Sequence, residues 1–262
     1  MDLGLKDKVV IITGGSSGIG AATALAFAAE GSKVAICART ASDVNALIAT
    51  GRDRGFDIYG ESVDVTNTDQ LGTFVENVVK KYGSLNIMFN NAGAGNSVYL
   101  MDLTREQWDK CIAVNLTAVW EGCKFAVPHI KAAGGGSIVS TTSLAARIPS
   151  TRRAIYAIAK AGVSSMTAML ASELAKDNIR VNAVSPGVVM SVMVKRSMDL
   201  DPNYDHNYLT RSAMMQRLGE PEEVAGGVLF LCSDMASFIT GEVLDISGGK
   251  FRVQDPWCSW ER

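Results

Sequence analysis

Residues 9–31 read VVIITGGSSGIGAATALAFAAEG. The first five residues are apolar and mostly β-branched, which predicts a buried strand, and the residues after 20 have the apolar spacing of a helix. The stretch from Thr13 to Gly20 between them is rich in glycine. Glycine lets the backbone turn sharply, and the free N–H groups of a helix start favour a nearby phosphate. In this position the turn predicts a dinucleotide site, although such a turn can also exist without a ligand.

The same alternation of strand and helix continues along the chain. Apolar, β-branched runs predict strands at 9–13, 34–37, 58–63, 87–90, 137–141, 181–184 and 243–245, and segments with helical spacing separate them. Such alternation predicts the α/β class, here a Rossmann-type, doubly wound domain with a seven-stranded parallel sheet flanked by helices. No repeat or proline-rich linker divides the chain, so we expect a single domain over 1–262, with its ligands beyond the carboxyl ends of the strands.

The composition excludes several classes of protein. The chain has 262 residues, of which 25 are Lys or Arg and 27 are Asp or Glu, so the formal charge of −2 argues against nucleic acid as a main partner. The five cysteines form no CxxC pair and there are only two histidines, which indicates free thiols and no metal site. The sequence shows neither a secretory signal nor an apolar run of about 20 residues for a membrane span. We therefore expect a cytoplasmic protein that does not associate with membranes.

The end of the second predicted strand, Cys37-Ala38-Arg39-Thr40, indicates which dinucleotide is used. An acidic residue at this place would bind the ribose 2′-hydroxyl, whereas an arginine can pair with a 2′-phosphate. The chain has Arg39 and no acid here, which predicts NADP(H) in preference to NAD(H), with Thr40 as a helper. The alternative is that Arg39 is a solvated surface charge.

Tyr156 and Lys160 are four residues apart and so share one face of a predicted helix. A free phenol has a pKa of about 10, and a nearby ammonium favours the phenolate. The pair is therefore suited to acid–base chemistry near neutral pH.

Seven motifs in order resemble the short-chain dehydrogenase/reductase family over nearly the whole chain: TGGSSGIG at 13–20, Asp64, NNAG at 90–93, Asn115, Ser143, YAIAK at 156–160, and Pro186-Gly187. The resemblance implies that Tyr156 is the general acid or base and that Lys160 lowers its pKa and holds the nicotinamide ribose. It implies that Ser143 stabilises the substrate oxygen and that Asn115 holds a water of a proton relay. The implied cofactor-binding residues are Gly14, Ser16, Ser17, Gly18, Ile19, Gly20, Arg39, Thr40, Asp64, Val65, Asn91, Ala92, Gly93, Tyr156, Lys160, Pro186, Gly187, Val189 and Ser191.

Two positions depart from the pattern of the family. Ser191 stands where threonine is more common, which keeps a hydroxyl for the nicotinamide carboxamide. Ser17 stands where many NADP-using members have a basic residue, which leaves Arg39 to carry most of the phosphate recognition.

Residues 188–217 interrupt the alternation and hold five of the eleven methionines, which predicts a substrate lid or loop. Methionine suits irregular apolar pockets, so the lid favours a sizeable hydrophobic ketone or a hydroxysteroid-like alcohol, unless these side chains merely pack the lid onto the sheet. The tail 250–262 carries Phe251, Trp257 and Trp260, which we expect to be buried, for example across a subunit interface. Relatives are commonly tetramers or dimers, so a homo-oligomer is expected.

Together these features predict an enzyme that acts on a small-molecule substrate. We expect an NADP(H)-dependent oxidoreductase that transfers hydride between nicotinamide and a carbonyl or secondary alcohol carbon. The alternatives within the family are a reductase of a 3-oxoacyl thioester or of a sugar or polyol. The alternative of another class is a dinucleotide-sensing protein without catalysis, which would be expected to have lost Ser143, Tyr156 or Lys160.

Overall fold

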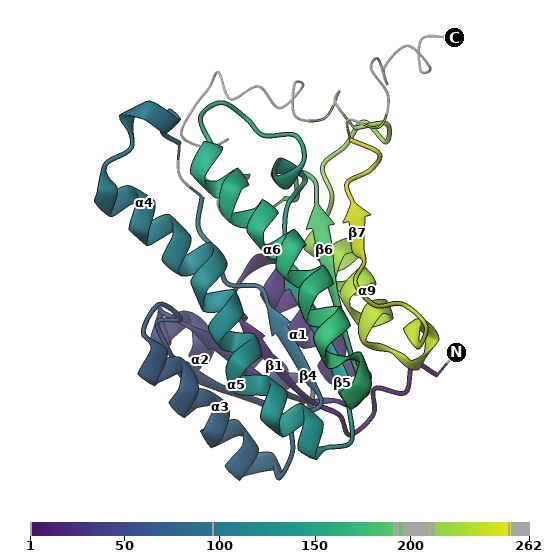
Figure 1. The fold of residues 1–262 in the computed structure, drawn as a ribbon. Helices are drawn as coiled ribbons and strands as arrows, with labels where there is room; N and C mark the ends of the chain where they lie inside the picture. Colours follow the sequence, from purple (N-terminus) through teal and green to yellow (C-terminus); the bar gives the residue numbers. More distant parts are fainter. Residues whose placement is uncertain are drawn as a thin grey trace.

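A seven-stranded parallel sheet runs through the centre of the molecule in the order β3-β2-β1-β4-β5-β6-β7 (Figure 1). The computed structural model describes residues 2–95, 97–190, 194–195, 210, 213–250 and 252. The strands are β1 (Val9–Thr13), β2 (Lys33–Ala38), β3 (Ile58–Ser62), β4 (Ile87–Asn90), β5 (Gly136–Thr141), β6 (Ile179–Pro186) and β7 (Val243–Ile246). The order reverses between β1 and β4, so the crevice at their carboxyl ends is where a sheet of this type binds its ligand.

Helices cover both faces of the sheet (Figure 1). One face packs against α1 (Gly18–Ala29), α2 (Ala41–Asp53) and α9 (Pro221–Cys232). The other face packs mainly against α3 (Thr68–Tyr82), α5 (Ala118–Ala132) and α6 (Ala154–Leu174). The remaining helical segments are α4 (Arg105–Ile112), the π-helical turn η2 (Ala113–Thr117), and the short 3-10 turns η1 (Leu100–Asp102), η3 (Leu144–Ala146), η4 (Ala175–Asp177) and η5 (Asp234–Ala236).

The strands are buried because both of their faces carry apolar side chains. Val10 and Ile12 of β1 point into the core that contains α1 and α9, whereas Val9 and Ile11 point into the core that contains α3 and α5. All four are 0% exposed. Two-sided burial explains why the sequence shows continuous apolar runs, and the predicted fold class is confirmed.

The ends of the helices follow local sequence signals. Asn67 caps α3 by accepting a hydrogen bond from Gln70 N at 3.0 Å, and Gly83 ends that helix in the left-handed region with φ 79°. Thr104 and Gln107 form a capping box at the start of α4. The N-caps Asn67 and Thr104 thus mark where the loops that follow β3 and β4 at the carboxyl edge end.

Several sequence-based expectations are refined by the structure. The strand predicted at 181–184 extends over 179–186, and the one predicted at 58–63 ends at Ser62. The segment Ala154–Asp177 is long and apolar enough for a membrane span, a criterion that core helices also meet; here α6 packs against β6. The predicted lid lies mostly outside the described residues, as do Ser191 and the tail apart from Lys250 and Arg252.

Candidate active site

The glycine-rich turn after β1 has a backbone that only glycine adopts easily. Gly14 and Gly18 have φ values of +62° and +52°, in the left-handed region. A Cβ atom on Gly20 would lie 2.1 Å from the carbonyl oxygen of Gly14, so the start of α1 packs directly on the turn. Ser17, the residue before α1, makes no side-chain capping bond. The first N–H groups of α1 are thus left to bind an anion, as predicted for a phosphate-binding turn.

Neutral hydrogen bonds hold this turn against the neighbouring strand ends. Thr13 Oγ1 accepts from the backbone N–H groups of Asn91 and Ala92, each at 3.0 Å. The side-chain amide of Asn91 donates to the carbonyl oxygens of Thr13 and Gly14 at 3.2 Å. Thr141 Oγ1 completes the set by donating to Asn91 Oδ1 at 3.2 Å. The carboxyl ends of β1, β4 and β5 are therefore tied together.

A cavity of about 550 Å³ opens above the turn and is lined by most of the predicted cofactor-binding residues. They are Gly14, Ser16, Ser17, Gly18, Ile19, Arg39, Thr40, Asp64, Val65, Asn91, Ala92 and Gly93. Sequence reasoning missed Asp43, Thr66, Gln107, Lys110 and Cys111, which also line the cavity. Gln107, Lys110 and Cys111 lie on α4, the helix that leads directly to Asn115. Their place shortly before Asn115 in the sequence is the signal that could have predicted them.

Asp64 is held in its charged form at the end of β3. Its Oδ1 accepts from Thr66 N at 2.9 Å and Thr66 Oγ1 at 2.7 Å. These hydrogen bonds lower the pKa of Asp64, and the charges of Arg39 and Lys110 lower it further. The carboxylate is therefore available to accept hydrogen bonds from a ligand at the edge of the cavity.

Tyr156 and Lys160 share one face of α6, as predicted. Lys160 Nζ lies 5.8 Å from the centroid of the Tyr156 ring. The lysine is 2% exposed, and its Nζ donates to the carbonyl oxygen of Thr141 at 2.7 Å. Burial lowers the pKa of Lys160 to about 8 because the charged ammonium is poorly solvated there.

Burial dominates the acidity of Tyr156. It raises the pKa of the phenol, while hydrogen bonding by Ser143 and the charge of Arg153 act in the lowering direction. Ser143 and Arg153 are thus groups that favour the phenolate, and the lowering of this pKa that the resemblance implies for Lys160 stays a prediction. Because burial raises the pKa of Tyr156 above its usual value, the phenol is protonated at neutral pH.

Asn115 lies in the π-helical turn η2 and is fully buried. Its Nδ2 donates to the carbonyl oxygens of Ala94 at 2.9 Å and Cys111 at 3.0 Å, and its Oδ1 accepts from Ala94 N at 3.2 Å. A Cβ atom on Gly93 would lie 2.9 Å from Asn115 Oδ1 and 3.5 Å from Lys160 Nζ. Asn115 is therefore placed next to Lys160, as expected for the predicted proton relay, whose water stays a prediction.

The remaining predicted residues lie on the loops that follow β5 and β6. Ser143 caps the turn η3 by accepting from Ala145 N at 3.1 Å. Pro186 ends β6, and Gly187 N donates to Ile246 O of β7 at 2.9 Å. Val189 is 8% exposed and bridges to Gly219. Ser191 lies outside the described residues, so its role stays a prediction.

The arrangement combines three functions at one edge of the sheet. The turn at 13–20 offers backbone N–H groups and no side-chain bulk at Gly14 and Gly18, which fits the pyrophosphate of a dinucleotide. Asp64, Arg39 and Thr40 supply polar groups at the β2 and β3 ends of the same cavity. Tyr156, Ser143 and Lys160 lie at the neighbouring end of β5, where a phenol with a hydroxyl partner can exchange a proton with a substrate oxygen.

Comparison with known proteins gives the same result. A family model described as enoyl-(acyl carrier protein) reductase matches residues 14–250. The chain is 40% identical over 247 residues to a 3-oxoacyl-[acyl-carrier-protein] reductase of Thermotoga maritima, covering 94% of this chain and 98% of the relative. It is 35% identical to a tropinone reductase homolog of Datura stramonium over 94% of this chain and 92% of that one.

Solved structures agree in fold as well. L-sorbose reductase from Gluconobacter frateurii, complexed with NADPH and L-sorbose, has a TM-score of 0.92 and 31% identity, covering 97% of this chain and 100% of that one. Similarity over nearly the full length, together with the glycine-rich turn and the Tyr156–Lys160 pair, establishes the relationship. The chain belongs to the short-chain dehydrogenase/reductase family and is an oxidoreductase that acts on alcohol or ketone groups with a nicotinamide cofactor.

Proposed function

We propose that the protein interconverts a ketone and a secondary alcohol with NADP(H), using Tyr156 as the proton donor and acceptor. One observation carries this proposal: Tyr156 and Lys160 face each other on α6, and Ser143 hydrogen bonding acts on the Tyr156 phenol. A non-catalytic dinucleotide sensor would not need this arrangement.

Each side chain has a separate task in the reduction. When bound, a reduced nicotinamide supplies the hydride that the carbonyl carbon accepts. Tyr156 Oη gives its proton to the carbonyl oxygen, and Ser143 Oγ donates a hydrogen bond to the same oxygen. The positive charge of Lys160 stabilises the phenolate that remains. Asn115, beside Lys160, holds the relay water through which the phenol regains a proton. In the oxidation the phenolate takes the proton of the alcohol, so that rate rises with pH toward the raised pKa of Tyr156.

The preference for NADP(H) rests on Arg39. This arginine lines the cavity at the end of β2, where Thr40 immediately precedes α2 without a side-chain capping bond and no acid occupies positions 37–40. A guanidinium there can pair with a 2′-phosphate. The NADPH complex of the similar L-sorbose reductase supports the same preference.

We further propose a sizeable hydrophobic ketone as the substrate. Methionine is frequent in 188–217, and Met215 is 55% exposed beside the loop that follows β7. The names of relatives include reductases of 3-oxoacyl thioesters and of a sugar, which are the alternatives within the family. We also propose a homo-oligomer, a dimer or tetramer, because Trp120 of α5 and Met169 of α6 are 47% and 60% exposed. The cytoplasmic location expected from the sequence stays a proposal.

A substrate panel tests the proposal. The wild-type protein is assayed by the loss of NADPH absorbance with a ketosteroid, the aryl diketone benzil, L-sorbose, acetoacetyl-CoA and crotonyl-CoA. We expect the steroid or benzil to be reduced fastest and crotonyl-CoA, which offers only a conjugated C=C bond, to be inert. Fastest turnover of L-sorbose would overturn the hydrophobic assignment. NADPH binding with no turnover of any compound would favour the sensor alternative.

The Tyr156→Phe variant tests the assigned proton donor. Because the phenol is lost while the ring stays, we expect turnover to fall by at least about 100-fold with NADPH affinity nearly unchanged, measured by NADPH fluorescence titration. Tyr82→Phe is the matched control, since that hydroxyl lies at the end of α3 near Asp57. Full activity of Tyr156→Phe would contradict the mechanism.

A further inference from the structure

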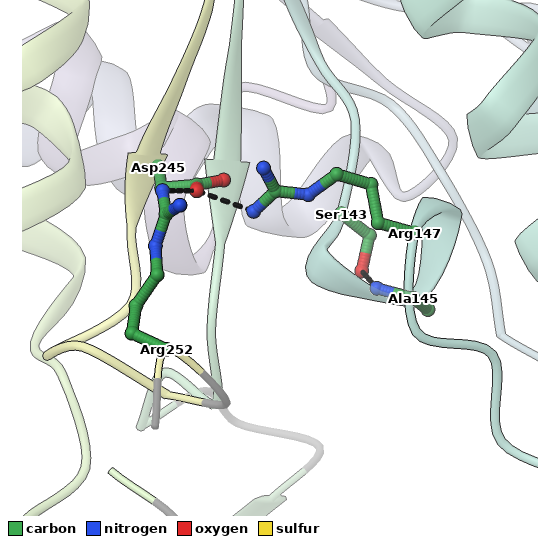
Figure 2. Close-up of polar contacts among 5 residues, drawn as sticks. All are labelled: Ser143, Ala145, Arg147, Asp245 and Arg252. Atoms are coloured by element: carbon green, nitrogen blue, oxygen red, sulfur yellow. Dashed lines mark hydrogen bonds and ion pairs between the residues drawn. The ribbon is translucent and has the colours of Figure 1, made fainter. Parts of the chain in front are cut away.

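The turn that presents Ser143 has an anchor at each end. At its start, Ser143 Oγ accepts from Ala145 N, which uses an oxygen lone pair and leaves the hydroxyl hydrogen for an oxygen in the site (Figure 2). At its end, Arg147 follows the last residue of η3 and extends its guanidinium away from the turn (Figure 2). Where that guanidinium binds therefore affects how firmly the turn is held.

Arg147 forms an ion pair with Asp245 of β7, a residue 98 positions away (Figure 2). Because β6 lies between β5 and β7, the arginine crosses the carboxyl end of a whole strand to reach its partner. The contact joins the loop after β5 to the last strand of the sheet.

Asp245 is the fixed member of this contact. Its side chain is 8% exposed, whereas those of Arg147 and Arg252 are 49% and 54% exposed. Both guanidiniums bind the same oxygen, Oδ2, while the buried Oδ1 has no hydrogen-bond partner among the described residues. A buried carboxylate is unfavourable unless cations neutralise it, so Asp245 requires the arginines more than they require it.

We propose that Asp245 is a positioning residue that holds Arg147 and, through it, the turn that presents Ser143 to Tyr156. The inference rests on the proposed role of Ser143. At one end of this segment, Lys160 Nζ donates a hydrogen bond to the carbonyl oxygen of Thr141. At the other end, Asp245 binds Arg147. The loop between Thr141 and Arg147 is thus held from α6 and from β7 at once.

Two consequences distinguish positioning from general stabilisation. Hydrogen bonding by Ser143 acts to lower the pKa of Tyr156. If the turn is less well fixed, this contribution weakens, and the part of the pH–rate profile that reports Tyr156 shifts to higher pH. Arg147 and Asp245 do not line the 550 Å³ cavity at the glycine-rich turn, whereas Asp245 lines a second cavity of about 340 Å³ together with Val189. A positioning role therefore predicts that kcat falls more than NADPH affinity does.

The experiment compares Asp245→Asn, Arg147→Met, the double variant and Arg147→Lys, with Arg252→Met as the control. With NADPH and the ketone of the panel that the wild-type protein reduces fastest, we expect kcat to fall about 10-fold in each of the first two variants. The double variant should lose no more than either single one, because both break one contact. Arg147→Lys should regain part of the activity, and Arg252→Met, which leaves the Arg147 contact intact, should stay within about twofold of wild type.

A second readout does not depend on the substrate. Hydrogen exchange of a peptide that covers 143–148 should be faster in Asp245→Asn and Arg147→Met than in wild type or Arg252→Met. Unchanged exchange and unchanged kcat and pH profile in both variants would overturn the proposal, as would an equal loss in Arg252→Met. Tyr156→Phe, assayed in parallel, separates the cases: if it is inactive while the Asp245 variants are normal, only the positioning role fails, and if it is active, the proposed function fails.

Discussion

The two turns that flank the catalytic centre are held in different ways. The phosphate-binding turn after β1 is fixed by backbone shape and by neutral hydrogen bonds that Asn91 donates to Thr13. The Ser143 turn after β5 is held by local hydrogen bonds, such as those from Ala145 N to Ser143 Oγ and from Ala146 N to Ser143 O, and also by a long-range ion pair from Arg147 to Asp245. An anion must bind beside the first turn, and a charge-free cradle leaves its backbone N–H groups available to that anion.

The difference also concerns tolerance to change. At Gly14 and Gly20 of the first turn, backbone atoms lie too close to leave space for a methyl group, so added atoms there displace the backbone itself. The second turn depends on long, half-exposed side chains, whose loss weakens the position of a hydroxyl without blocking the site. We therefore expect large effects on cofactor binding from the first turn and moderate effects on turnover from the second.

The largest effect is expected at Gly20. In Gly20→Ala the new Cβ would lie 2.1 Å from Gly14 O and 2.8 Å from the Asn91 side-chain nitrogen, so the turn must move. We expect NADPH affinity to fall by about 100-fold or more, as measured by fluorescence titration, which corresponds to about 3 kcal/mol. The matched control is Gly226→Ala in α9, where the new methyl meets nothing within 4 Å. That substitution should leave NADPH affinity unchanged and stabilise the helix by up to about 1 kcal/mol. A wild-type NADPH affinity in Gly20→Ala would show that the turn accepts a methyl group at this position.

The next effect is expected at Arg39. In Arg39→Ser the 2′-phosphate loses its cation, so we expect the KM for NADPH to rise about 10- to 100-fold, while that for NADH changes less than about threefold. Arg52→Ser, an exposed arginine at the end of α2, serves as the control. Equal changes for both dinucleotides would show that Arg39 does not select between them.

The last effect is expected in the stability, and not in the cofactor affinity, of a Lys160→Met variant. Folding buries the ammonium and lowers its pKa from 10.5 to about 8, which disfavours the charged form in the folded state. Between those pH values the unfolded chain binds more protons than the folded one, so wild-type stability rises with pH in this window. The substitution should therefore stabilise the protein below pH 8, by about 1–3 kcal/mol, and progressively less toward pH 10.5.

Thermal unfolding at several pH values measures this gain. A stabilisation of this size raises Tm by several degrees in a chain of this length. Lys80→Met, an exposed lysine on α3, should change little at any pH. A Lys160→Met protein that is less stable than wild type at pH 7 would mean that the hydrogen bond to Thr141 outweighs the desolvation of the charge.

Much of the fold and of the cofactor site was predictable because it depends on local signals. The β-branched runs predicted all seven strands, and their continuous apolar character predicted cover on both faces. Gly14, Arg39 and Asp64 each follow the end of a strand, and parallel strands bring such ends to one edge. Spacing alone put Tyr156 and Lys160 on one face of α6.

The contacts that hold the Ser143 turn were not predictable in this way. Arg147 and Asp245 are 98 residues apart, and nothing in either segment specifies the direction of the arginine. One signal was present, since Asp245 is a charged residue in the strand predicted at 243–245 and a charge in such a strand needs a partner. The sequence did not say which of the 25 basic residues that partner would be.

The π-helical turn at 113–117 has a consequence for how the chain tolerates changes of length. Its closing bond runs from Ala118 N to Ala113 O, five residues back, so the segment holds one residue more than an α-helical turn. Deleting Ala113 or Val114 would let the segment wind as a regular α-helix and would move Asn115 by one position, roughly 100° around the helix axis. The amide of Asn115 would then leave Ala94. A shortened chain could keep every functional side chain in its sequence and still aim one of them at the wrong neighbour.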